Sequence, residues 1–349
     1  MFHFIVLFFF LFFEGACWGQ EAVPAPPNQN ANLKIGMIGN FIGHAGTNIP
    51  DPGNKFDFSE GELNLQAAID PYANGTFVVT FPSQGSVGIE EAYLTTTALP
   101  WTLQAKVGKF HTHFGKLNKM HRDAFPFIDL PLMLSHLFNG DQWSDTGGSL
   151  SGLIPNRWDH FLELDLQVLN GNVGSSFNNG QTRDLAYLAH LDSFHELNEN
   201  SALDWGLSGA NGVNDPAGQF RTVLEGLDIT YKWKRPVTGT YRSFGWITEF
   251  FGSQKGTGST VVYSKGLYSF AEYQFAQRWS AGGRYDYAEQ IDDNNQFETA
   301  ESAIVTFKPS EFQSLRAQYK HTFRSNSLPG DEVLFQWLFL IGAHPAHAY

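Results

Sequence analysis

Residues 315–324 read LRAQYKHTFR, a stretch in which apolar and polar side chains alternate. Because successive side chains of a strand point to opposite faces, one face holds Leu315, Ala317, Tyr319, His321 and Phe323 and the other holds Arg316, Gln318, Lys320, Thr322 and Arg324. The same period of two recurs in residues 158–168, 223–233 and 278–287. The pattern predicts β-strands with one largely apolar face and one wet, charged face.

The length of these segments separates a membrane barrel from a soluble sandwich. Strands of soluble proteins average about 5–6 residues, whereas a strand that crosses a bilayer needs about 9–11. Sixteen segments can be counted: 33–44, 57–69, 74–81, 87–96, 101–110, 147–154, 158–170, 184–192, 201–210, 220–233, 240–252, 260–275, 278–288, 298–308, 312–324 and 332–342. The sequence therefore predicts an all-β fold, a transmembrane antiparallel β-barrel of about 16 strands.

The connections favour the same fold, because outer-membrane barrels have long loops at one end and short turns at the other. AGTNIPDPGNK and EQIDDNNQF are long, whereas DPYAN and KRPVTG are short. Only residues 193–200, SFHELNEN, form a connection longer than a turn should be at that place. The third long loop, residues 111–146, is by far the largest. It is too apolar and aromatic for a disordered linker, so we expect it to pack against the inner wall.

Composition excludes several classes of protein. The chain has 349 residues, of which 42% are hydrophobic and 16% charged, and it holds a single cysteine. These values exclude a disordered chain and a disulfide scaffold. The formal net charge of −13 makes nucleic acid a poor partner, since phosphate binding needs a basic face.

The N-terminus predicts export. Residues 1–19 contain an unbroken apolar run, Phe4 to Phe13, followed by small residues, as in a cleaved signal peptide. Ten apolar residues are too few for a membrane-spanning helix, which needs roughly 20. Alternatively, Cys17 could carry a lipid, as in a lipoprotein, but Glu14, three positions before it, suits a lipoprotein signal poorly. Residues 20–32 are expected to be a flexible leader, and residues 33–349 the barrel.

Several motifs resemble known outer-membrane barrels. Residues 90–118, EEAYLTTTALPWTLQAKVGKFHTHFGKLN, resemble the EAY, GKF and FG stretch of phosphate-selective-porin-like barrels. AAIDPYANGTFVV (67–79), GKLNKMHRDAFPFIDLPL (115–132) and GAHPAHAY (342–349) resemble a little-characterised barrel family, some of whose members are described as zinc-regulated or TonB-dependent outer-membrane receptors. The resemblance implies a bacterial outer-membrane location, a third loop folded into the lumen, and a homotrimer.

Neither narrower description follows from the residues. A TonB-dependent transporter needs about 22 strands and a separate plug, which a chain of this length does not provide. Anion selectivity asks for rings of Lys or Arg in the pore. The inferred inner face instead mixes both signs: Lys106, Lys232, Arg278, Arg284, Arg316 and Lys320 with Glu60, Glu62, Glu163, Asp165, Asp228 and Asp286. No ion preference follows from this mixture.

Charged residues of the third loop and the inner wall are candidates for a pore constriction, because pore-lining charges are how channels select. The candidates are Lys116, Lys119, Arg122, Asp123 and Asp129 on the loop, and Arg284, Arg316, Lys320, Glu163 and Asp165 on the wall. The alternative interpretation is that the loop charges are merely solvated.

Histidines suggest a second kind of site. His111 and His113 would share a face of an extended chain and could hold a metal, with His121, Asp129 or His136 completing the shell. Imidazole suits zinc or copper. His344 and His347 near the terminus add to this interpretation. Against it, no tight four-ligand spacing is present, and the histidines could simply line the pore.

The sequence predicts a non-enzymatic channel without a cofactor, for passive diffusion of small hydrophilic solutes or ions. The chain has no GxSxG elbow, HExxH motif or Walker loop. Two alternatives stay open at this point: a barrel in which His111, His113 and His121 capture zinc, and a barrel enzyme acting on lipid or peptide.

Overall fold

A computed structural model of the chain describes residues 33–48, 55–83, 85–157, 160–180, 183–235, 241–258 and 260–342. The predicted signal peptide and leader lie outside these residues, as do His344, His347 and Tyr349. Within the described ranges, no helix is both long and apolar enough to cross a bilayer.

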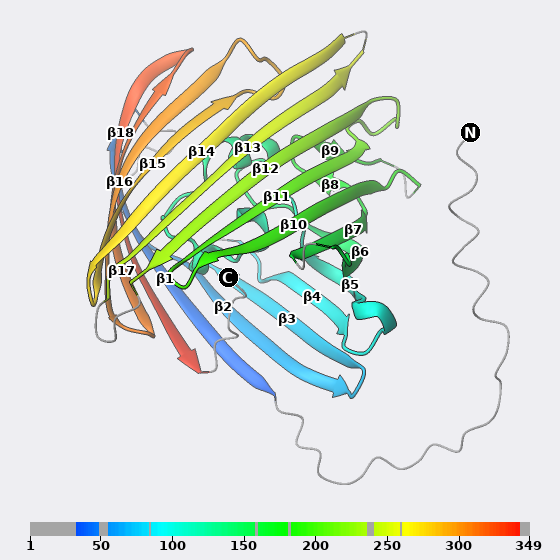
Figure 1. Cartoon of the computed structure of the whole chain (residues 1–349). Helices are drawn as coiled ribbons and strands as arrows, with labels where there is room; N and C mark the ends of the chain where they lie inside the picture. Colours follow the sequence, from blue (N-terminus) through cyan, green and yellow to red (C-terminus); the bar gives the residue numbers. More distant parts are fainter. Residues whose placement is uncertain are drawn as a thin grey trace, which may run out of the picture. The chain divides into compact units, whose positions relative to one another are not determined.

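Sixteen strands close into one antiparallel barrel (Figure 1), as predicted. They are β1 (Lys34–Thr47), β2 (Lys55–Asp70), β3 (Ala73–Pro82), β4 (Gly88–Thr96), β5 (Gln104–His111), β6 (Ser144–Leu153), β7 (Phe161–Leu169), β10 (Ala186–Asn198), β11 (Ser201–Val213), β12 (Arg221–Lys234), β13 (Ser243–Thr257), β14 (Thr260–Ala276), β15 (Trp279–Glu289), β16 (Phe297–Ser310), β17 (Gln313–Arg324) and β18 (Ser327–Gly342). Each strand pairs with its neighbour in the barrel, and β18 closes the wall against β1.

Burial along the strands is the reverse of that in a soluble protein. In β17, Tyr319 and Phe323 are 48% and 46% exposed, whereas Arg316 and Gln318 are only 5% and 1% exposed. β18 repeats the pattern, with Val333, Phe335 and Trp337 exposed beside a buried Gln336. An exposed apolar row on a closed wall is the arrangement that lipid requires, because lipid cannot solvate charge.

The connection at residues 193–200 differs from the loop that its length indicated. β10 continues through Phe194 and His195, which pair with Asp204 and Leu203 of β11, so the turn is only Glu199–Asn200. The extra residues extend the strands beyond the predicted bounds. This end of the barrel therefore keeps a short turn here too.

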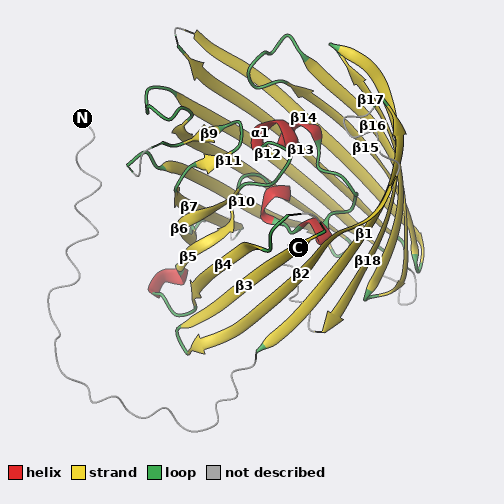
Figure 2. Ribbon diagram, turned by 180° about the vertical axis from the view of Figure 1, so that it is seen from behind, coloured by secondary structure: helices red, strands yellow, loops and turns green. Residues whose placement is uncertain are grey.

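The remaining elements lie in two connections. β8 (Asn172–Val173) and β9 (Phe177–Asn178) form a small separate sheet between β7 and β10. Residues 112–143, which we name the connecting segment, run from β5 to β6 and contain the short helical turns η3 (Leu117–Lys119) and η4 (Arg122–Ala124) and the helix α1 (Leu132–Phe138), drawn in red in Figure 2. A further turn, η2 (Pro100–Thr102), precedes β5.

The connecting segment carries a large share of the hydrophobic core. Phe114, Leu117, Phe127 and Trp143 are almost fully buried, and they belong to one cluster with wall residues such as Phe270. Phe127 packs edge-on against the Phe270 ring, with centroids 5.4 Å apart. The prediction that this stretch is ordered is confirmed, because its aromatic side chains find partners on the strands.

Candidate functional site

Soon after it leaves β5, the connecting segment attaches to β13 through a buried carboxylate. The backbone N–H groups of Lys116 and Leu117 donate to the buried Glu249 carboxylate at 3.0 and 2.9 Å, and Tyr268 Oη donates to it at 2.6 Å. Gly115 has a φ of +70°, and an added Cβ would collide with the Glu249 carboxylate. Glycine is therefore required at this point, both for its backbone conformation and for the close approach.

Two amide side chains hold the ends of the segment together. Asn118 Nδ2 donates to the carbonyls of Thr112 and Trp143 at 2.9 and 3.1 Å, and Asn118 Oδ1 accepts the Trp143 N–H at 2.7 Å. Gln142 Nε2 donates to the Met120 carbonyl at 2.7 Å. These bonds satisfy buried backbone groups that no regular element would pair.

A carboxylate of the segment is bound by cations of the wall. Arg284 Nη2 on β15 donates to Asp129 Oδ1 at 2.8 Å, and Lys320 Nζ on β17 lies 2.6 Å from Oδ2. Gln318 Nε2 donates to the same carboxylate. Burial alone would raise the pKa of Asp129, but the charges of Arg284 and Lys320 outweigh it and hold that pKa well below its usual range. We name this group the Asp129 anchor.

A neighbouring carboxylate extends the Asp129 anchor. Arg284 Nε donates to Asp286 at 2.7 Å, and Asp286 accepts the backbone N–H of Leu132, at the start of α1, at 3.2 Å. The Arg284 guanidinium also stacks on the Phe127 ring, 4.4 Å from its centroid. Two cations of this anchor thus meet two carboxylates, Asp129 and Asp286. A third carboxylate, Glu332, lies 3.9 Å from Lys320 Nζ but has its own partner in His44, 2.6 Å away.

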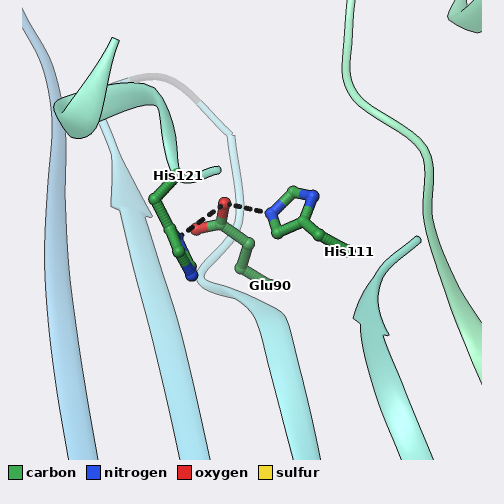
Figure 3. Close-up of side chains that lie close together, drawn as sticks. All are labelled: Glu90, His111 and His121. Carbon is green, nitrogen blue, oxygen red and sulfur yellow. Dashed lines mark hydrogen bonds and ion pairs between the residues drawn. The ribbon is translucent and has the colours of Figure 1, made fainter. Parts of the chain in front are cut away.

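The opposite arrangement surrounds His121, as Figure 3 shows in part. His121 Nε2 lies 2.9 Å from Glu91 Oε2, and His121 Nδ1 lies 3.6 Å from Glu90 Oε1 and 3.9 Å from Glu62 Oε2. On the other side of Glu90, His111 Nε2 lies 2.9 Å from the same Oε1. We name this group the His121 anchor.

The carboxylates of the His121 anchor stabilise a cation. Burial alone would lower the pKa of His121, but its contacts with Glu90 and Glu91 outweigh burial and raise that pKa well above its ordinary value. Three carboxylates surround two imidazoles here. Unlike the Asp129 anchor, this group has more acids than bases.

A β-bulge explains how two consecutive glutamates reach the same histidine. β4 pairs Glu91 with Val78 and Ile89 with Val79 of β3, so that Glu90 is the extra residue at a register shift. A bulge interrupts the alternation of side chains and re-aims one of them. Regular pairing would have placed Glu90 and Glu91 on opposite faces of the wall.

Two cavities border the connecting segment. One, of about 600 Å³, is lined by Thr80, Ile89, Glu90, His111 and Arg122, near the barrel end that carries the connecting segment. The other, of about 310 Å³, is lined by segment residues between Lys116 and Pro126 and by Lys232, Lys308 and Arg316. Lys232 and Lys308 lie near the strand ends that lead into the opposite end of the barrel.

The predicted constriction residues fall in several environments. Lys116 forms an ion pair with Asp204, Arg122 with Asp141 at 3.0 Å, and Lys119 is exposed. On the wall, Arg284 and Lys320 meet Asp129, Arg316 donates to Gln336 at 2.9 Å, and Asp165 accepts from Ser149 at 2.6 Å. Glu163 pairs across the sheet with Asp192, and Asp123 lies with Glu62 and His121.

His111 and His113, which the sequence pairs, have different neighbours in the structure. β5 ends at His111, so pairing in the sheet no longer fixes the direction of the His113 side chain. His113 instead stacks on His190 with centroids 3.7 Å apart and lies 3.4 Å from Asp165. Burial, helped by the charge of Lys119, lowers the pKa of His113 to about 4.

The other proposed metal ligands are also separated. His136 lies 3.1 Å from the Glu289 carbonyl, and Asp129 belongs to its own anchor. Among the candidate ligands within the described residues, only His111 and His121 come together, with ring centroids 5.2 Å apart.

Sequence reasoning missed the acids that complete these groups: Glu90, Glu91, Glu249, Asp204 and the wall amide Gln318. For the first two, the signal was visible. GIEEAY (88–93) opens a strand with two adjacent acids, which a strictly alternating strand would not place on one face. No local signal marks Glu249, because its partners on the segment, Lys116 and Leu117, lie more than a hundred residues away along the chain.

Comparison with known proteins identifies the family of the chain. Residues 58–342 match the family described as TonB dependent receptor-like, beta-barrel. The chain belongs to this family. An uncharacterized protein of Aquifex aeolicus (strain VF5) is 29% identical over 355 residues, covering 88% of this chain and 74% of the relative.

Solved structures share the fold at low sequence identity. The anion-selective porin from Comamonas acidovorans has a TM-score of 0.62 at 8% identity, covering 89% of this chain and 100% of the porin. The outer membrane channel DcaP of Acinetobacter baumannii has a TM-score of 0.60 at 12% identity, covering 89% and 97%. The trimer form of OmpT, an outer membrane protein of Vibrio cholerae, has a TM-score of 0.57 at 9% identity, covering 88% and 99%.

The chain is thus an outer-membrane-type β-barrel, as the motifs implied. The family takes its name from receptors. The argument from strand number therefore bears on whether the chain works as a TonB-dependent transporter, and not on whether it belongs to the family. Sixteen strands form the barrel in the described residues, fewer than the about 22 of such transporters. The phosphate-selective resemblance stays a prediction.

Proposed function

We propose that the protein is a porin-like channel of the bacterial outer membrane, through which small hydrophilic solutes or ions diffuse passively. The observation that carries this proposal is the burial pattern of the closed wall. Polar side chains such as Arg284, Gln318 and Gln336 are buried, while apolar ones such as Tyr319 and Trp337 are exposed. A wall of this kind encloses a polar interior and presents hydrocarbon to lipid.

In this proposal the connecting segment lies in the lumen and narrows it. Its bonds go to polar residues of the buried rows on β11, β13, β15 and β17, namely Ser208, Glu249, Arg284, Gln318 and Lys320. A loop attached to strands that far apart around a closed wall has to cross the interior to reach them all. A solute would pass from the 600 Å³ cavity, around residues 116–126, to the 310 Å³ cavity.

The two cavities differ in charge, which would set selectivity. The larger cavity is mixed, with Glu60, Glu90 and Asp141 beside Lys109, Arg122 and His111. In the smaller one, Lys116, Lys232, Lys308 and Arg316 face a single acid, Glu272, beside the Trp246 and Phe270 rings. Charges held at close quarters select solutes by sign and size.

Single-channel recording in planar bilayers tests the channel proposal. Folded protein should give stepwise conductance, and the reversal potential in a salt gradient should report which cavity dominates selectivity. Protein that is folded by gel mobility, inserts into vesicles and yet conducts nothing would end the proposal. Heat-denatured protein from the same preparation is the matched control.

We further propose a homotrimer, which the trimer form of the Vibrio cholerae neighbour supports by fold alone. Light scattering of the detergent-solubilised protein, corrected for bound detergent, should give three chains per particle. A monomer that conducts would remove the trimer proposal and leave the channel proposal intact.

A further inference from the structure

Three side chains beside the larger cavity lie in the arrangement of metal ligands (Figure 3). One ligand atom from each of Glu90, His111 and His121 lies within 4.8 Å of the other two. Glu90 Oε1 is 2.9 Å from His111 Nε2 and 3.6 Å from His121 Nδ1. Ligands around tetrahedral zinc, at bond lengths of about 2.0–2.1 Å, lie about 3.4 Å from each other. Small side-chain movements would therefore close the shell.

From this geometry we propose that Glu90, His111 and His121 bind one divalent transition-metal ion, with zinc preferred. Two imidazoles and a carboxylate are a ligand set that zinc accepts, and they leave a fourth position. Glu62 is placed to fill that position, since its Oε2 lies 3.9 Å from His121 Nδ1. Water from the adjoining cavity is the other candidate for the fourth ligand.

A supporting carboxylate provides independent evidence for this site. Glu91 Oε2 lies 2.9 Å from His121 Nε2, the ring nitrogen that would not hold the metal. Glu91 Oε1 accepts the backbone N–H of His111 at 2.8 Å. A metal-binding histidine usually donates its second ring N–H to a carboxylate, which fixes the tautomer and the ring orientation. Glu91 thus positions both imidazoles toward Glu90.

Charge and access favour a cation at this place. Glu62, Glu90 and Glu91 are buried or half-buried around two imidazoles, so a dication would offset charge that the protein itself leaves in excess. Glu90 and His111 also line the 600 Å³ cavity, which gives an ion a path to the site. The Asp129 anchor has no such excess and borders on wall cations.

The metal would join the connecting segment to the wall. His121 comes from the segment at the start of η4, Glu90 from β4, and His111 from the last position of β5. An ion shared by all three would hold the segment against β4 and β5. This proposal does not depend on conduction, so it stands or falls separately from the channel.

The test is zinc binding by the full-length protein folded in detergent, measured by competition with a chromogenic chelator. We expect one ion per chain in the wild type. His111→Ala and His121→Ala should each weaken binding by at least about 100-fold, and Glu91→Gln by about 10–100-fold, as for loss of a supporting carboxylate. Cobalt, used as a spectroscopic probe, should give the strong visible absorption of a tetrahedral site in the wild type but not in His111→Ala or His121→Ala.

Matched controls come from the same chain. His113→Ala and His136→Ala remove histidines that lie elsewhere and should leave zinc affinity unchanged. Glu90→Gln and His111→Asn replace proposed ligands while changing the shape of the side chain little. Gel mobility before and after heating checks that each variant folds.

Three results would overturn the proposal. The first is a folded wild type that binds no zinc. The second is binding that survives both His111→Ala and His121→Ala but disappears in a His344→Ala/His347→Ala variant. The third is binding that is lost in Asp123→Asn and retained in Glu90→Gln, which would assign the ion to the neighbouring group of Glu62, His121 and Asp123.

Discussion

The two anchors of the connecting segment are eight residues apart in the chain and opposite in polarity. At His121 the segment offers a base to carboxylates of the wall, and at Asp129 it offers an acid to cations of the wall. The Asp129 anchor pairs two cations with two carboxylates, whereas the His121 anchor sets three carboxylates against two imidazoles.

This difference in charge balance implies different roles: the Asp129 anchor is structural, whereas the His121 anchor can bind a cation. A buried network whose charges are balanced and hydrogen-bonded gains nothing from a further ion, and removing one member leaves an uncompensated charge. A group with excess carboxylates is stabilised by any cation it can reach. The same segment therefore combines a fixed attachment with a place for an ion.

The largest expected effect is at the balanced anchor. Asp129→Asn removes the carboxylate that Arg284 and Lys320 share and leaves Arg284 with Asp286 alone, so local stability of the segment should fall by about 3–5 kcal/mol. Hydrogen exchange of the Ile128 and Leu132 amides, which bond to Gln318 and Asp286, measures this opening. A loss below about 1 kcal/mol, the value of an exposed ion pair, would contradict the structural role assigned to this anchor.

Gly115→Ala should weaken both anchors together. The added Cβ meets the Glu249 carboxylate where the segment enters, and the positive φ disfavours a side chain, so we expect a cost of about 1–3 kcal/mol. Hydrogen exchange should increase in peptides covering His121 and in those covering Asp129. An increase confined to one anchor would show that the two are attached independently. Gly283→Ala, whose added Cβ meets no atom closer than 3.6 Å, is the control.

Acid should affect the Asp129 anchor through its carboxylate. The folded-state pKa of Asp129 lies below its ordinary value, so the stabilisation of the folded state by the Asp129 carboxylate is fully present above about pH 4. It is lost as pH falls through the folded-state pKa, by up to about 1.4 kcal/mol per pH unit. Asp286 and Glu332 also face these cations and titrate too, so the observable is the difference from Asp129→Asn. A gap between wild type and variant that stays constant below pH 4 would contradict the assignment.

The smallest effect is expected at the unbalanced anchor without metal. Glu90→Gln loses the favourable contact with His111 but relieves repulsion by Glu62 and Glu91, so the net change should be within about 1 kcal/mol. Hydrogen exchange of peptides covering residues 119–124, measured in a chelator, tests this. Adding zinc should then protect the wild type and not the variant. A change as large as that of Asp129→Asn would erase the contrast between the anchors.

Much of the fold could be predicted because it depends on local pattern. Alternation in LRAQYKHTFR and in its counterparts specified which side chains face lipid, and the structure places Tyr319 outside and Gln318 inside accordingly. Strand number followed from segment length, since the bilayer sets a minimum span. At 193–200, which was counted as a connection too long for its place, β10 instead continues to Asn198.

The candidate site could be predicted only in part. The sequence singled out Asp129, Arg284, Lys320, His111 and His121, but it could not say which of them meet. His113 was misplaced because the strand period was carried past the end of β5, where the chain turns. Glu249 and Gln318 bond to the segment from far along the chain, and no local signal reports such contacts.

The sequence by itself therefore determined the class of molecule: a chain of long amphipathic strands whose apolar rows need lipid. Tertiary structure alone decided which charges became neighbours, because that depends on closure of β18 onto β1 and on the path of residues 112–143 across the wall. It also decided, through one extra residue in β4, that Glu90 and Glu91 reach the same imidazole. Alternation is a property of adjacent residues, whereas an ion site is a property of strands brought together by closure.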